Sequence, residues 1–289
     1  MRANSMSEVQ KNRQASYHQF RRASESHEHA IAIYEPSEGV LGASASINLW
    51  RPLVERGGKE YSAAQIRIMS GTKEDFDAIE VGWHVFPWFY GDNDDDDDAN
   101  GDGNTRFFIS WTNNSYRRSC YNDECEGFVM ESDKIALGSV LRPISSYDGG
   151  QYDLNVGLWK DSESKRWWLS YNYTNVGYWP EELFTHLRTS GRKVEWGGEI
   201  FNRKIHNRHT STEMGSGQFA KEEYGRAAYF KELKVLVGGT DPGWILPRSV
   251  TGLTSNPNCY SIKPHTDIDG FGNGGFFYGG PGSGSPSCV

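Results

Sequence analysis

The sequence contains few prolines, few cysteines and no long apolar run. Its 289 residues include 11 prolines and 4 cysteines. No apolar stretch reaches the roughly 18 residues that a membrane-spanning helix needs, and residues 1–30 lack the apolar segment of a signal peptide. Lysine and arginine are not in excess, since the formal net charge is −8. We therefore expect neither a membrane nor a nucleic acid as a partner.

Glycine and aromatic residues are abundant instead, with 33 glycines, 15 tyrosines, 14 phenylalanines and 10 tryptophans. This composition is typical of short strands joined by tight turns. Alternating apolar and polar positions predict strands over residues 43–50, 61–70, 78–86, 105–112, 151–160, 166–171, 193–202 and 227–237. One short helix is expected over residues 180–188, because Pro180 precedes Glu181 and Glu182. The sequence therefore predicts an all-β fold, an antiparallel β-sandwich.

The predicted organisation is one domain over residues 39–289. Residues 1–38 are rich in Ser, Glu, His and Arg without clear periodicity, so we expect a flexible arm or the remnant of a pro-region. The acidic run at 92–102 contains the first half of a calcium-loop pattern, but the loop's last ligand position is Phe107 rather than glutamate. We interpret this run as a solvated insertion, with a weak calcium site as the alternative.

Two short segments combine a glutamate with apolar, Trp- and Gly-rich neighbours. They are Ile79-Glu80-Val81-Gly82-Trp83 and Glu195-Trp196-Gly197-Gly198-Glu199. A glutamate on a strand usually faces solvent. If two such carboxyls meet in one cleft, however, one can give a proton while the other takes one. The pattern therefore indicates a candidate hydrolytic pair.

Ordered matches to a known family run from about residue 39 to the end of the chain. The matching segments are Ala78-Ile79-Glu80-Val81-Gly82-Trp83, Phe86-Pro87, Tyr90-Gly91-Asp92-Asn93, Thr105-Arg106-Phe107-Phe108, Gly138-Ser139, Pro143-Ile144-Ser145-Ser146-Tyr147, Gly177-Tyr178-Trp179-Pro180, Leu183-Phe184, Glu195-Trp196-Gly197-Gly198-Glu199, Met214-Gly215-Ser216-Gly217 and Tyr278-Gly279-Gly280-Pro281-Gly282. With them the chain resembles the neprosin family, plant-type glutamic endopeptidases that cleave after proline.

The resemblance implies that Glu80 and Glu199 are the catalytic glutamates and activate water between them. Glu195 lies four positions from Glu199, so it shares that strand face, and we interpret it as a neighbour or structural partner. Two nearby carboxyls resist both being charged, so the pair holds one proton best in acid. We therefore expect an acid-active endopeptidase whose partners are proline-containing proteins or peptides, acting as a monomer without a cofactor.

Proline selectivity implies a small apolar slot beside the glutamates. Our candidates for its walls are Trp83, Tyr178, Trp179 and Trp196. Any single tryptophan is more often part of a core.

The four cysteines form two local pairs in the sequence. Cys120 and Cys125 flank a predicted turn, and Cys259 and Cys288 lie near the C-terminus. An even count in two pairs favours disulfides over free thiols or a zinc site, and the resembling family pairs its cysteines similarly. Asn113 and Asn172 each begin a glycosylation sequon. We therefore expect a secreted or vacuolar protein.

Other chemistries have weaker support in the sequence. The His206-Asn207-Arg208-His209 segment is not a complete zinc motif, and Ser216 lacks the Gly-x-Ser-x-Gly context, so we expect no metal and no serine nucleophile. Two alternatives remain open. Paired glutamates with many aromatics also suit a glycan-binding or glycan-hydrolysing sandwich. A neprosin-like binding protein without catalysis is the other.

Overall fold

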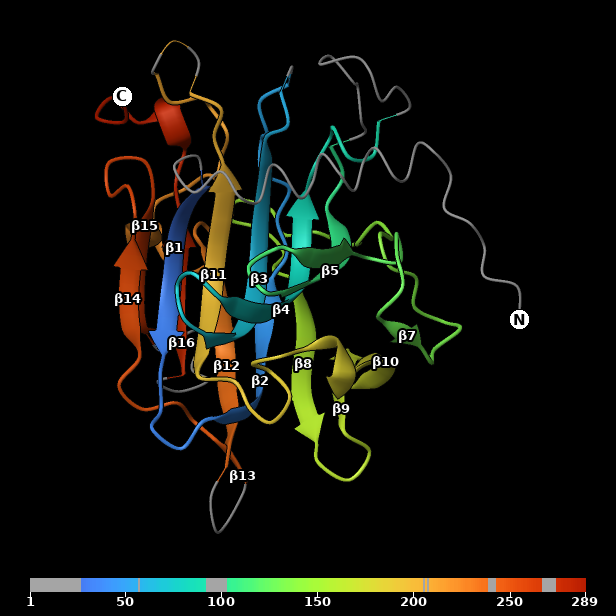
Figure 1. Ribbon diagram of the computed structural model, residues 1–289. Helices are drawn as coiled ribbons and strands as arrows, with labels where there is room; N and C mark the ends of the chain where they lie inside the picture. Colours follow the sequence, from blue (N-terminus) through green and yellow to red (C-terminus); the bar gives the residue numbers. More distant parts are fainter. Residues whose placement is uncertain are drawn as a thin grey trace.

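The computed structural model describes residues 27–56, 58–91, 103–204, 206, 208–238, 243–266 and 274–289. In these residues two antiparallel sheets face each other, which confirms the predicted all-β sandwich (Figure 1). The acidic run at 92–102 lies outside the described residues. Within the described ranges, no helix has the length and apolar character that crossing a bilayer requires.

The first sheet has the strand order β14-β1-β11-β3-β4-β5-β6. Its strands are β14 (Thr251–Thr254), β1 (His27–Tyr34), β11 (Lys193–Phe201), β3 (Tyr61–Gly71), β4 (Phe76–Val85), β5 (Arg106–Asn113) and β6 (Arg118–Tyr121). In Figure 1, β1, β11, β3 and β4 stand side by side as the long strands of one layer. Strands that are distant in the sequence therefore become neighbours at the centre of this sheet.

The second sheet has the order β15-β16-β12-β2-β8-β9-β10-β7, with β13 added beside β12. Its strands are β15 (Ser261–Thr266), β16 (Gly275–Gly279), β12 (Ala228–Val237), β2 (Val40–Asn48), β8 (Asp153–Asp161), β9 (Arg166–Tyr171), β10 (Thr174–Pro180), β7 (Val129–Met130) and β13 (Gly243–Ile245). The core lies between the two sheets, where alternate residues of each strand point inward. In β4, for example, Ile79, Val81 and Trp83 are fully buried in that core.

Two predicted boundaries differ from the structure. Residues 27–34 belong to β1, which pairs with β11 and β14, so the sandwich begins before residue 39. The sequence of this strand begins with two histidines and a glutamate, and both faces of the strand are covered. Apolar and polar residues therefore do not alternate clearly along it. The helix expected over 180–188 is only a three-residue 3-10 turn, η2 (Glu181–Leu183). Two similar turns are η3 (Ala220–Glu222) and η4 (Gly282–Gly284).

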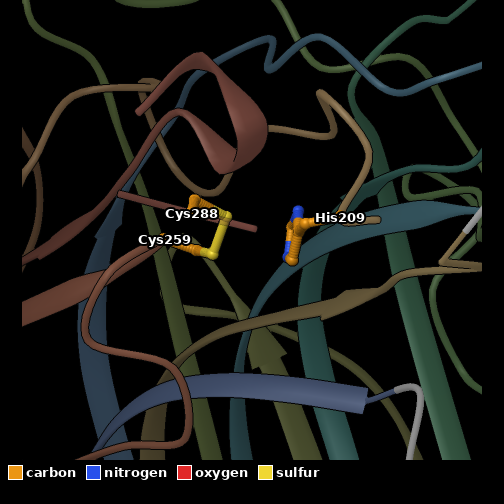
Figure 2. Close-up of side chains that lie close together, drawn as sticks. All are labelled: His209, Cys259 and Cys288. Atoms are coloured by element: carbon orange, nitrogen blue, oxygen red, sulfur yellow. A yellow bond between two sulfur atoms is a disulfide. The ribbon is translucent and has the colours of Figure 1, made fainter. Parts of the chain in front are cut away.

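Both predicted disulfides are present, joining Cys120 to Cys125 and Cys259 to Cys288. His209 lies beside the second disulfide, as Figure 2 shows. The possible ligand atoms of His209, Cys259 and Cys288 lie within 4.8 Å of one another, close enough to hold a metal ion. The sulfur atoms are bonded to each other, however, and therefore are not the thiolates that bind zinc. The Nε2 atom of His209 instead lies 3.1 Å from Oε2 of the buried Glu28.

Candidate active site

Glu199 lies on β11 and faces away from the sandwich core, with only 2% of its surface exposed. The Tyr61 hydroxyl donates a hydrogen bond to its Oε1 atom over 2.5 Å, and the Gln65 amide donates to Oε2 over 2.7 Å. His27 Nδ1 lies 2.7 Å from the same Oε1. Three groups from two neighbouring strands thus hold this carboxyl in one orientation.

Glu80 lies on β4 and is also only 2% exposed. Its Oε1 atom is 3.0 Å from Nε of Arg67, the residue directly opposite on β3. A second carboxylate, Glu195 on β11, lies 3.5 Å from Nη1 of the same guanidinium. Arg67 therefore links β4 and β11 across the strand between them.

The two predicted glutamates share the outer face of the first sheet. β3 runs between them, with Arg67 opposite Glu80 and Ala63 opposite Glu199. Glu80 is therefore in line with Arg67 and Glu195, whereas Glu199 lies four residues further along β11, and Gln65 lies between Ala63 and Arg67 on the same face. Glu80 and Glu199 thus share one face of the sheet, with Arg67 and Gln65 between them.

The glycines next to these glutamates allow neighbouring strands to approach closely. A Cβ atom on Gly82 would clash with the carbonyl oxygen of Ala64 on β3. Gly197 has a φ of 147°, and a Cβ there would clash with the carbonyl oxygen of Ala30 on β1. The space beside Gly197 is therefore filled by protein backbone and gives no room to a substrate.

Glu195 is held in its ionised form by two cations. Burial raises the pKa of this carboxyl, but the Arg67 guanidinium and the Lys193 ammonium outweigh burial and keep the pKa below its usual value. The Lys193 Nζ atom lies 2.7 Å from Glu195 Oε1. This geometry supports the interpretation of Glu195 as a structural partner, because its charge is already neutralised by neighbours.

We expect Glu195→Gln to lower the free energy of unfolding by about 2 kcal/mol at pH 7, the size of a charge-assisted hydrogen bond. A depressed carboxyl pKa stabilises the fold above the unfolded pKa, and this contribution disappears as pH falls through the folded value. The difference between variant and wild type should therefore shrink in acid. Urea unfolding at pH 7 and pH 3 measures it, and an equal difference at both pH values would contradict this account.

A groove of about 1140 Å³ is lined by Glu199 and follows the outer face of the sheet. Glu199 and Arg67 line one end, together with His27 and His29. Burial lowers the pKa of His29, although Glu199 and Glu195 act in the opposite direction. His29 therefore stays neutral to a lower pH than an exposed histidine. The other end is lined by loop residues that include Lys73 and Arg192.

The structure corrects the predicted walls of the proline slot. Trp83, Trp179 and Trp196 are fully buried in the core between the sheets, so they do not face the glutamates. Trp83, for instance, donates its indole N–H to the Asn48 carbonyl over 3.0 Å. Tyr178 lies on the outside of the second sheet, with the Arg166 guanidinium 4.0 Å from its ring. None of the four lies beside Glu80 or Glu199.

Aromatic residues that we did not predict do lie on the glutamate face. A compact cluster packs on this outer surface and comprises Tyr61, Ala63, Phe86, Trp88, Phe89, Phe108, Tyr121 and Phe201. Tyr61, Phe86 and Phe108 also line a small hollow that includes Gln65. The alternation of side chains along β4 and β11 offered a signal, since Phe86 shares a face with Glu80, and Phe201 with Glu199. Tyr61 and Ala63 of β3 could be placed in this cluster only by knowing which strands pair with β3.

The two predicted glycosylation sites differ in accessibility. Asn113 is only 6% exposed, and its amide nitrogen donates to the Leu183 carbonyl over 2.5 Å. A glycan at this nitrogen would need space that the buried side chain does not have. Asn172 is exposed in the turn between β9 and β10. The structure therefore favours Asn172 over Asn113 as an acceptor.

Comparison with known proteins adds one decisive match and several weak ones. The chain resembles a crystal structure of scytalido-glutamic peptidase with a transition state analog inhibitor, at 12% identity and a TM-score of 0.45, covering 88% of this chain and 98% of that one. It also resembles SCP-B, a member of the Eqolisin family of peptidases in a complex with the tripeptide Ala-Ile-His, at 11% identity and a TM-score of 0.42, covering 88% and 98%. Similarity at this level carries no functional argument. The Neprosin family, in contrast, matches directly over residues 58–281, which include both glutamates and their surroundings. The chain belongs to the Neprosin family.

Proposed function

We propose that this protein is an acid-active glutamic endopeptidase that cleaves peptide bonds after proline. The observation that carries the proposal is the placement of Glu80 and Glu199 on one sheet face, each with an ordered set of partners, with Glu199 and the Arg67 partner of Glu80 lining a long groove. Family membership supports the same assignment, because the resemblance noted in the sequence implies this activity.

The proposed reaction needs two carboxyls and one water molecule. One carboxylate takes a proton from the water as the water oxygen bonds to the scissile carbonyl carbon, and the other carboxyl donates a proton to the carbonyl oxygen. When the tetrahedral intermediate collapses, the C–N bond breaks, the leaving nitrogen takes the proton that the first carboxyl received from water, and a hydroxyl of the intermediate returns a proton to the second carboxylate. Tyr61 and Gln65 orient Glu199, while Arg67 orients Glu80. Acid conditions favour the state in which the pair holds one proton.

The outer aromatic cluster replaces the core tryptophans as our candidate for proline recognition, because it lies on the glutamate face, and its rings are at most 9% exposed in this structure. Tyr61 belongs to both the cluster and the Glu199 hydrogen-bond set, so a ring packed against it would lie next to the carboxyl. Proline is compact and apolar, and it packs well on aromatic faces. The groove with its loop-lined end suits an extended peptide on either side of that residue. We further propose that the disulfide-bonded chain acts as a monomer in a secreted or vacuolar setting.

Cleavage of a peptide library by the purified chain tests the proposed function. The library contains matched peptides with proline, alanine or leucine at one position, incubated from pH 2 to pH 8 and analysed by mass spectrometry. We expect cuts after proline, concentrated at acid pH. Equal cutting after alanine and leucine would overturn the proline assignment, and absence of cutting after acid incubation of a folded sample would overturn the peptidase itself.

A further inference from the structure

A second groove, of about 440 Å³, lies on the outside of the opposite sheet. Its lining comes from β2, β8, β9, β12 and β13 and from the turn after β9. It shares no residue with the groove at the glutamates. The proposed peptidase reaction gives this groove no role, so its chemistry needs a separate explanation.

One wall of the second groove belongs to a row of aromatic side chains. Strand pairing places Trp244, Trp159, Trp168 and Tyr178 in one line across β13, β12, β2, β8, β9 and β10. Trp244 is 44% exposed, and the rings of Trp159 and Trp168 are nearly parallel. Gly42 lies between Trp244 and Trp159 in the row, and a Cβ there would be 3.1 Å from the Trp244 ring and 3.0 Å from Trp159. The glycine thus lets two indoles lie close to the sheet surface.

Polar groups line the other side of the same groove. The buried Ser46 hydroxyl lies 2.8 Å from Asn155 Oδ1 and 2.6 Å from Glu232 Oε2. Tyr173, which is 85% exposed, donates its hydroxyl to the same Asn155 oxygen over 3.2 Å. The floor between the two walls is formed by Ser44, Gly157 and Ser170.

Glu232 reaches this groove through an irregular strand. Its φ is 55°, a left-handed conformation that non-glycine residues rarely adopt inside a strand. The register of β12 against β2 shifts at this point, between Lys231 and Lys234. A β-bulge of this kind re-aims a side chain, and such backbone strain is found mainly where the position has a use.

We propose that this groove binds a neutral saccharide chain. Exposed indole faces pack against the C–H faces of pyranose rings, while hydroxyl, amide and carboxylate groups a few ångströms away satisfy the sugar hydroxyls. Glu232 and Lys234 are the charged residues of the lining, and their charges cancel, which favours an uncharged sugar over a uronic acid. A proline-rich peptide would need apolar slots between the rings, and here the floor carries serine hydroxyls. The glutamate face then acts on peptides while this face holds the protein to glycan.

Affinity electrophoresis tests the proposal, because a chain of net charge −8 migrates in native gels. The gels contain hydroxyethylcellulose, xyloglucan or galactomannan, with an empty gel as reference, and the protein is first freed of N-linked glycans because Asn172 adjoins Tyr173. We expect retardation by at least one polysaccharide, and about tenfold weaker binding for Trp244→Ala and for Tyr173→Ala. The control is Tyr147→Ala, which removes a 53% exposed ring outside this groove.

Each outcome decides the proposal. Retardation that both variants lose and the control keeps supports it, and Tyr173→Ala reports on the groove even if Trp244→Ala folds poorly. No retardation of the wild type by the three polysaccharides overturns it, as does equal retardation of wild type and variants. Displacement by decaproline instead of by oligosaccharide would assign the groove to peptides. Peptide cleavage is expected to be unchanged in all three variants, so the test is independent of the proposed peptidase.

Discussion

Replacing Glu199 or Glu80 by glutamine is expected to abolish peptide hydrolysis while leaving the fold intact. Glutamine keeps the size of the side chain and a carbonyl oxygen that still accepts from Tyr61, but it neither takes nor gives a proton at reaction pH. Loss of a general acid or base costs roughly 100- to 10,000-fold in rate, and loss of an essential pair member belongs at the upper end. The measurement is kcat/KM on a proline-containing peptide, with circular dichroism as the check on folding.

Glu195→Gln is the matched control for Glu199→Gln. Glu195 has the same residue type, strand and face, but its carboxylate is neutralised by Arg67 and Lys193. We expect this variant to retain most of its activity. Activity in Glu199→Gln together with inactivity in Glu195→Gln would exchange their roles. Since residues that act as a unit are not additive, the Glu80→Gln, Glu199→Gln double variant should be no worse than either single variant.

The alternation of residues along each strand was enough to predict part of this site. Alternation puts Ile79 and Val81 on the other face of the strand from Glu80, and the structure has both in the core. The same rule would have rejected Trp83 and Trp196, which lie an odd number of positions from Glu80 and Glu199. A local rule, applied consistently, would have removed half of the incorrect slot residues.

Strand order limits what the sequence predicts about the rest of the site. Tyr61, Gln65 and Arg67 matter because β3 lies between β11 and β4, strands that are more than 100 residues apart in the chain. No local pattern in residues 61–71 indicates which strands will flank them. β1 presents the same difficulty, since His27 reaches Glu199 only through pairing of β1 with β11. Contacts between distant strands set these positions, whereas local periodicity sets only the face.

Arg67→Met is expected to be the most destabilising single change on the glutamate face. The side chain is mostly buried and contacts two buried carboxylates, so its removal leaves Glu80 and Glu195 without their shared cation. Breaking a buried ion pair in this way costs about 3–5 kcal/mol. Glu195 retains Lys193, which places the expected cost near the lower value. The free energy of unfolding in urea at pH 7 measures it, and Arg192→Met, an exposed cation lining the same groove, serves as the control with little expected change.

The pH dependence of this variant separates charge from packing. If the cost arises from unpaired carboxylates, it must shrink as pH falls below about 4, where carboxyls become protonated. If it arises from the lost packing of the arginine stem, it stays constant with pH. Arg67→Lys gives a second comparison, because lysine restores the charge but not the planar fork that reaches Glu80 and Glu195 together. We expect Arg67→Lys to recover part of the stability and little of the activity, since Glu80 would keep a cation nearby and lose its fixed orientation. Full recovery of activity would show that a positive charge alone is sufficient at this position.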